Sequence, residues 1–136
     1  MDRTQRTARM PARPRAERGA ANRRGGEMAE EAVALHYMGR GCRVLARRWR
    51  SVAGEIDLVV QDGETVVAVE VKRASTHDTA ALRLSPRQRA RLCAALALFC
   101  EGQDAAGAPD GRRFDLALVD GMGRVELYPN AWGEDW

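Results

Sequence analysis

Apolar and polar residues alternate most regularly in residues 54–72, which read GEIDLVVQDGETVVAVEVK. Two valine-rich runs flank the pair Asp62-Gly63, a strong short signal for a tight β-hairpin turn. The stretch therefore predicts two antiparallel strands. Because successive side chains of a strand point to opposite faces, alternate positions should share a face. One apolar face is expected to hold Ile56, Leu58, Val60, Val67, Val69 and Val71.

Acidic residues stand on these strands where a buried strand should carry none. A two-residue turn would pair Asp57 with Ala68, and a four-residue turn would place Asp57 directly opposite Glu70. Both registers put Asp57, Glu70 and Lys72 on one face, with the two carboxyls roughly 5 to 8 Å apart. A three-residue loop would break this arrangement.

Like charges facing each other destabilise a sheet, so the cluster of Glu55, Asp57 and Glu70 needs compensation. A divalent cation would supply it, and carboxylate oxygens with room for water suit Mg²⁺ or Mn²⁺. The alternative is an open sheet face on which the acids are solvated and Lys72 forms an ordinary surface ion pair.

Helical and strand patterns surround the hairpin and predict an α/β fold. Apolar residues recur at helical spacing over residues 26–39, and residues 42–50 are typical of a strand. Ser85-Pro86 is a good cap for a second helix that Gly102 should end. Two short strands follow near residues 114–118 and 125–127.

Charge divides the chain into two parts. Residues 1–24 hold eight arginines against Asp2 and Glu17, whereas the rest holds 14 basic residues against 17 acids. Because the arginine-rich segment lacks apolar periodicity, we expect residues 1–24 to be disordered and residues 25–136 to form one domain. The tail is either a nonspecific arm for nucleic acid or a solubilising extension.

Cysteine content and hydropathy exclude several classes of protein. The chain has three cysteines without a Cys-x-x-Cys pair, which argues against a disulfide framework or a structural zinc site. No uncharged run approaches the roughly 20 residues of a membrane span, and no apolar segment suits a secretory signal. A reducing cytoplasm is the expected location.

An acid on one hairpin strand, Glu-x-Lys on the next and a Glu on a preceding helix together resemble the PD-(D/E)xK nuclease core of restriction endonucleases and archaeal Holliday-junction resolvases. More narrowly, the chain is similar to the bacterial YraN family of proposed endonucleases. The similarity covers residues 25–132. It rests on Gly26-Glu27 with Ala29, Arg43-Val44-Leu45 with Arg47, the segments GEIDLVV and VAVEVK, Arg87-Gln88, Arg113-Phe114-Asp115 and Asn130-Ala131-Trp132.

This resemblance implies a restriction-endonuclease-like core, in which a central mixed β-sheet with hairpin 54–72 at its centre is flanked by α-helices. It implies Asp57, Glu70, Lys72 and Glu27 as catalytic residues, with Glu31 as the substitute for Glu27. It further implies a metal held by Asp57, Glu70 and the carbonyl of Val71. Lys72 would then orient the attacking water and stabilise charge in the transition state.

Basic residues supply candidate contacts to nucleic acid. Arg47, Arg48 and Arg50 surround Trp49, an arrangement that can follow a phosphate backbone and stack a base, or can simply blunt a sheet edge. The start of the second helix is either a phosphate-binding or a solvated basic face. The candidate residues are Arg47, Arg48, Arg50, Arg73, Arg87 and Gln88.

The expected function is metal-dependent hydrolysis of phosphodiester bonds in DNA, which is favoured over RNA, with branched or junction DNA as a candidate substrate. A noncatalytic nucleic-acid-binding module and a protein-interaction role in DNA processing remain the alternatives, because a fold does not dictate a function. Cleavage of both strands would need two sites, so a homodimer is a further expectation.

Overall fold

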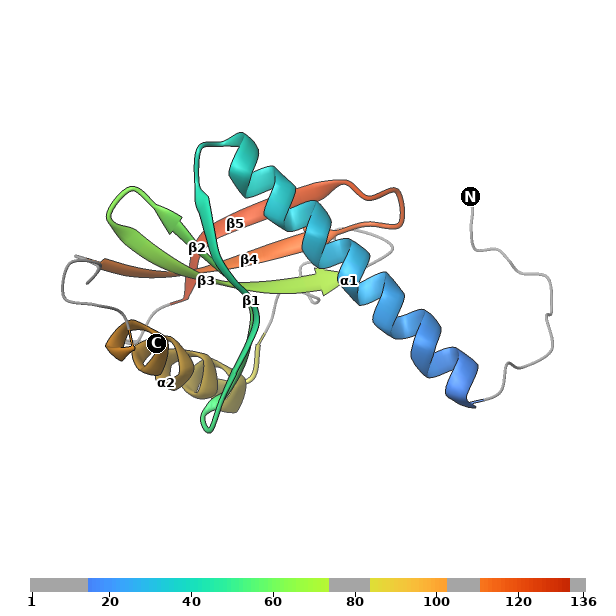
Figure 1. Cartoon of the computed structure of the whole chain (residues 1–136), viewed down its shortest axis with the longest axis horizontal. Helices are drawn as coiled ribbons and strands as arrows, with labels where there is room; N and C mark the ends of the chain where they lie inside the picture. Colours follow the sequence, from blue (N-terminus) through green and yellow to red (C-terminus); the bar gives the residue numbers. More distant parts are fainter. Residues whose placement is uncertain (1–14, 74–83, 103–110, 133–136) are drawn as a thin grey trace.

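The computed structural model describes residues 15–73, 84–102 and 111–132 (Figure 1). It confirms the predicted α/β class, with two helices and five strands in these residues. In chain order the elements are α1 (Arg15–Gly39), β1 (Arg43–Ser51), β2 (Gly54–Asp62), β3 (Thr65–Arg73), α2 (Pro86–Glu101), β4 (Gly111–Val119) and β5 (Val125–Trp132). Neither helix is long and apolar enough to cross a membrane in the part of the chain that is described.

The strands form one mixed sheet in the order β1-β2-β3-β4-β5. All neighbours are antiparallel except β3 and β4, which run parallel and are joined through α2. A parallel pair needs such a crossover, whereas the antiparallel pairs need only turns. The hairpin β2-β3 thus lies at the centre of a sheet flanked by helices, as expected for a restriction-endonuclease-like core.

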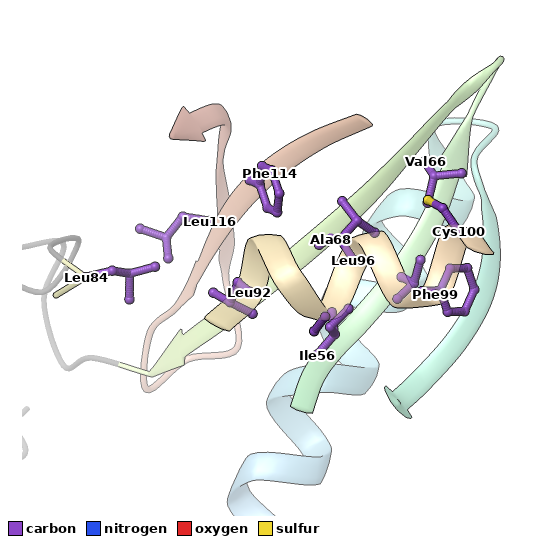
Figure 2. Close-up of a cluster of buried hydrophobic side chains, with 12 residues drawn as sticks. Ile56, Val66, Ala68, Leu84, Leu92, Leu96, Phe99, Cys100, Phe114 and Leu116 are labelled. Carbon is purple, nitrogen blue, oxygen red and sulfur yellow. The ribbon is translucent and has the colours of Figure 1, made fainter. Parts of the chain in front are cut away.

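Each helix covers one face of the sheet and builds its own apolar cluster. Figure 2 shows the cluster beneath α2, where Leu92, Leu96 and Phe99 meet side chains of the sheet. On the other face, Ala29, Val33, Ala34 and Tyr37 of α1 pack on β2, β3 and β4. The central strands are therefore buried on both faces, which explains their nearly continuous runs of valine.

Helix α1 begins at Arg15, inside the segment that the sequence predicts to be disordered. Residues 15–24 are rich in Ala and Arg, which favour helix, and they extend a helix whose C-terminal half is packed on the sheet. This N-terminal part projects beyond the sheet (Figure 1). Residues 1–14 of the predicted tail lie outside the described residues.

The hairpin turn is one residue later than predicted. Asp62 pairs with Thr65, so the two turn residues are Gly63 and Glu64 rather than Asp62 and Gly63. Gly63 adopts φ 62°, and a two-residue turn with Gly at its first position requires such a left-handed conformation. Of the two registers that the sequence allows, the structure therefore has the one in which position 57 lies opposite position 70.

The expected alternation of faces fails at Ile56. Leu58 and Val60 pack in the cluster beneath α1, but Ile56 packs in the cluster beneath α2. Between the pairs Arg47↔Leu58 and Trp49↔Ile56, Arg48 adopts φ 51°, a left-handed conformation rare for a residue with a side chain. This local irregularity interrupts the pleat of the strand pair.

Candidate active site

Asp57 lies where the regular pairing of β2 with β3 ends. The paired residues run from Asp62↔Thr65 to Leu58↔Val69, and the next step of this register sets Asp57 opposite Glu70. At this position a side chain takes the place of a backbone hydrogen-bond acceptor, because Asp57 Oδ2 accepts the backbone N–H of Val71 at 2.9 Å. The carboxyl is thereby held in a fixed position at the end of the hairpin.

Asp57 and Glu70 influence each other's protonation. Burial, followed by the negative charge of Asp57, raises the pKa of Glu70 to about 8. Burial also raises the pKa of Asp57, although its hydrogen bonds with the Val71 N–H and with Glu70 oppose this rise. The interaction between the two carboxyls lowers the pKa of Asp57 and raises the pKa of Glu70, so Glu70 is the more readily protonated of the pair.

Lys72 lies on the same strand as Glu70, and its positive charge lowers the pKa of Glu70. The Lys72 side chain is half-buried, and Val71 packs at the margin of the cluster beneath α1. The structure thus brings together the predicted residues Asp57, Glu70 and Lys72, and the backbone N–H of Val71 contacts Asp57.

Helix α1 directs Glu30 toward this group. Glu30 is half-buried, and burial raises its pKa, with the charges of Asp57 and Glu55 adding to the rise. Its Oε1 accepts the Nε–H of Arg48 at 2.7 Å. The predicted Glu27 is exposed, and the substitute Glu31 is exposed and bridges to Arg47 at 3.3 Å. Among these three acids, Glu30 is the one whose electrostatics couple to the carboxyl pair.

The position of Glu30 in the helical repeat of α1 indicates that it faces the sheet, although the nuclease motif points to Glu27. Ala29, Val33 and Ala34 are buried against the sheet. Glu30 precedes Val33 by three positions and Ala34 by four, which places it on the inner side of α1. Helix phase therefore distinguishes Glu30 from its acidic neighbours.

Three arginines of β1, Arg47, Arg48 and Arg50, are paired with acids of the chain itself. Besides the Glu30 and Glu31 bridges, Arg50 Nε donates to Glu55 Oε2 at 3.0 Å. Glu55 therefore forms an ion pair with an arginine. Trp49 packs edge-on against Phe99 of α2 with ring centroids 5.2 Å apart, so its ring contributes to the core.

A cleft of about 270 Å³ opens beside the carboxyl pair. Strands β2 and β3 form one side of the cleft and helix α2 forms the other. Its lining residues are Gly54, Glu55, Asp57, Glu70, Gln88, Arg91 and Leu92. Gln88 is one of the predicted contacts, whereas Arg91 is not among the residues predicted from the sequence. Arg73 and Arg87, also predicted contacts, are exposed and do not line the cleft.

The chemistry of the site suits a hydrated divalent cation. Two adjacent carboxyls, one of which has a raised pKa, can exchange a proton for a cation, which would stabilise both in their ionised forms. Within residues 15–73, 84–102 and 111–132, no three side chains of His, Cys, Asp or Glu gather as a metal site. Mg²⁺ fits such a sparse set, because it keeps several waters and often takes one or two carboxylates.

Asp115, by contrast, belongs to the framework. It is fully buried on β4 and accepts hydrogen bonds from the Tyr37 hydroxyl at 2.7 Å, from Arg113 Nε at 2.9 Å and from the Asn130 N–H at 2.9 Å. Arg113 also reaches Asp62 at 3.1 Å. This network ties α1, β2, β4 and β5 together.

Comparison with known proteins gives one consistent result. The model of the uncharacterised protein family UPF0102 matches residues 29–119. A UPF0102 protein of Cereibacter sphaeroides is 48% identical over 114 residues, covering 84% of this chain and 97% of the relative. A UPF0102 protein of Ruegeria pomeroyi is 47% identical over 122 residues, covering 87% of this chain and 95% of the relative. The Dinoroseobacter shibae relative is 42% identical over 120 residues, covering 88% of each chain.

Proposed function

This chain belongs to the uncharacterised protein family UPF0102, and we propose that it is a metal-dependent endonuclease that hydrolyses phosphodiester bonds in DNA. One observation carries the proposal. Asp57 and Glu70 face each other at the end of a central hairpin, beside an open cleft and within the electrostatic reach of Lys72. Carboxyls with raised pKa values, a cation and a cleft form the kind of group that active sites use.

Asp57 and Glu70 would hold Mg²⁺ or Mn²⁺, with the carbonyl of Val71 as a further ligand. When bound, the ion supplies Lewis acidity toward the scissile phosphate and the attacking water. The N–H of Val71 fixes the Asp57 carboxyl, and the Lys72 ammonium orients water and stabilises negative charge as it develops. Glu30, held by Arg48, positions the hydration shell from the α1 side.

The resemblance of the hairpin to the PD-(D/E)xK core and to the YraN family supports the same assignment. It also suggests branched or junction DNA as the substrate. The mixed five-stranded sheet between two helices is consistent with that core, although a shared fold leaves the chemistry open. The assignment therefore depends on the site residues and on their behaviour in solution.

Cleavage assays can test the proposal directly. Purified protein is incubated with labelled flap, junction and single-stranded DNA in Mg²⁺ or Mn²⁺, beside the variants Asp57→Asn and Lys72→Ala. Loss of one of these groups should lower the cleavage rate about 100-fold or more. Glu64→Gln, which removes an exposed acid in the hairpin turn, serves as a matched control and should cleave like the wild type. Equal cleavage by all four proteins would exclude this site.

A noncatalytic nucleic-acid-binding module is the second candidate. It is favoured by the lack of a third side-chain ligand at the carboxyl pair in the described residues. DNA binding that survives both site substitutions, without cleavage by any of the proteins, would establish the module in place of the enzyme.

A further inference from the structure

The cap of α2 fixes the orientation of the Gln88 amide. Ser85 Oγ accepts the backbone N–H of Gln88 at 3.1 Å, and Gln88 Oε1 accepts the backbone N–H of Ser85 at 3.0 Å. Because a backbone N–H can only donate, the accepting atom of the amide must be its oxygen. The Nε2 group therefore keeps two N–H donors for another partner, and no acceptor for them occurs among the described residues.

Arg91 stands one helical turn after Gln88 and lines the same cleft. Its exposed guanidinium makes no ion pair with any residue of 15–73, 84–102 or 111–132, unlike Arg47, Arg48 and Arg50 of β1. Gly54 lies against the base of this side chain, since a Cβ at position 54 would be 3.8 Å from Arg91 Cβ. The backbone of β2 therefore approaches α2 closely and sets Arg91 across from the acids.

Opposite sides of the cleft consequently carry complementary groups. Asp57 and Glu70 present oxygen acceptors on the sheet side, while Gln88 Nε2 and Arg91 present donors on the helix side. A phosphodiester next to the acids needs such donors, because the carboxylates would otherwise repel it. An arginine fork and an amide nitrogen are both suited to phosphate oxygens.

We propose that Gln88 Nε2 and Arg91 form a phosphate-binding pair that holds the backbone of a nucleic-acid strand against the carboxyls, through the phosphate beside the one that is cut. This inference rests on the proposed nuclease function and deepens it. The pair contacts the phosphate backbone rather than a base, so this contact is independent of the nucleotide sequence. Arg91 and Gln88, rather than Arg87, provide the phosphate contact of α2.

Two substitutions separate binding from folding. Arg91→Gln removes the charge of an exposed side chain. Gln88→Glu keeps an oxygen that can accept the Ser85 N–H, so the capping box stays intact while the donor becomes an anion. The control is Arg43→Gln, because Arg43 is exposed and pairs with Gln61 at the other end of β2 from the cleft.

Each substitution is placed in the Asp57→Asn protein, in which the proposed cleavage is blocked. Binding of fluorescein-labelled junction DNA in MgCl₂ is followed by anisotropy over a salt series. We expect Arg91→Gln and Gln88→Glu each to raise Kd about tenfold, and Arg91→Gln to reduce the slope of log Kd against log salt by about one. Arg43→Gln should change Kd less than about twofold. Thermal unfolding of Gln88→Glu, expected close to that of its parent, confirms that the cap is kept.

The outcomes distinguish the two proposals. Weakened binding in both α2 variants supports the phosphate-binding pair even if the wild type cleaves none of the DNA substrates, a result that would remove only the nuclease function. Cleavage by the wild type together with unchanged Kd in both variants overturns the pair and leaves the nuclease function standing. An equal loss of binding in Arg43→Gln also overturns it, because the effect would then be one of general charge.

Discussion

Arg48 donates its Nε–H to Glu30 at 2.7 Å and so joins β1 to α1 directly beside the carboxyl pair. The contact occurs at the residue where β1 adopts a left-handed conformation and the pleat of the sheet is interrupted. Strained backbone of this kind persists when surrounding contacts hold it. The ion pair with Glu30 is one such contact, and it aligns the helix acid with the site.

Glu30 should therefore matter for cleavage more than Glu27. We expect Glu30→Gln to lower the cleavage rate about tenfold or more, because it removes a charge that acts on Asp57 and Glu70. Glu27→Gln, an exposed acid one turn earlier, should retain a rate within about twofold of the wild type. Single-turnover cleavage of labelled DNA measures both. A larger defect in Glu27→Gln would restore the residue suggested by the sequence motif.

Stability should fall as pH rises in the absence of metal. The pKa of Glu70 is raised from 4.5 to about 8, so the folded state keeps a proton that the unfolded state has lost. A group whose pKa is raised by folding stabilises the folded state while it is protonated. This contribution is complete below pH 4.5 and is lost as the pH rises to 8. We expect Tm in EDTA to drop by about 5–10 °C from pH 5 to pH 8.5. Glu70→Gln, which can still donate to Asp57, should have a flatter profile and a higher Tm than the wild type at pH 8.5.

Metal binding should strengthen over the same range of pH. A divalent cation bound by Asp57 and Glu70 must displace the proton of Glu70, so its apparent affinity rises as the pair ionises. The increase in Tm on adding MgCl₂ or MnCl₂ should be larger at pH 8.5 than at pH 6.5. This readout needs no DNA and no turnover. Asp57→Asn should abolish the increase at both values, and an equal increase in that variant would locate the cation elsewhere.

The buried network around Asp115 should dominate the stability of the framework. Asp115→Ala would leave Arg113 and the Tyr37 hydroxyl with a missing partner in the interior, and it should cost about 3–5 kcal/mol of unfolding free energy. Tyr37→Phe removes a single hydrogen bond and should cost about 1 kcal/mol. Urea denaturation measures both values. A smaller loss for Asp115→Ala than for Tyr37→Phe would contradict the role given to the carboxylate.

Local signals made much of the fold predictable. The alternation in the hairpin, the capping pair Ser85-Pro86 and the glycine after each helix each act over a few residues, and the structure has the corresponding elements. The grouping of Asp57 with Glu70 could also be predicted, since it depends only on the parity of the turn.

Features that depend on distant contacts could not be predicted in the same way. Ile56 packs beneath α2, next to the point where Arg48 on the neighbouring strand adopts an unusual conformation. The choice of Glu30 follows from which side of α1 packs on the sheet. The role of Arg91 depends on the close approach of Gly54 across two elements that are far apart in sequence. The conformation of Arg48 and the close approach of Gly54 leave no periodic signal in the chain, whereas the helical spacing of Ala29, Val33 and Ala34 does.

The order of the strands also bears on how the chain assembles. The contact of Asp57 with the Val71 N–H joins residues 14 apart, whereas the parallel pairing of Thr65 with Gly111 must wait for the crossover that contains α2. Closing the shorter loop costs less chain entropy, so we expect the hairpin to form earlier. Pulse-labelled hydrogen exchange should protect β2 and β3 before β4, and the reverse order would contradict this expectation. A folding chain would thus bring Asp57 and Glu70 together before helix α2, which carries the positive charge of Arg91, has packed on the sheet.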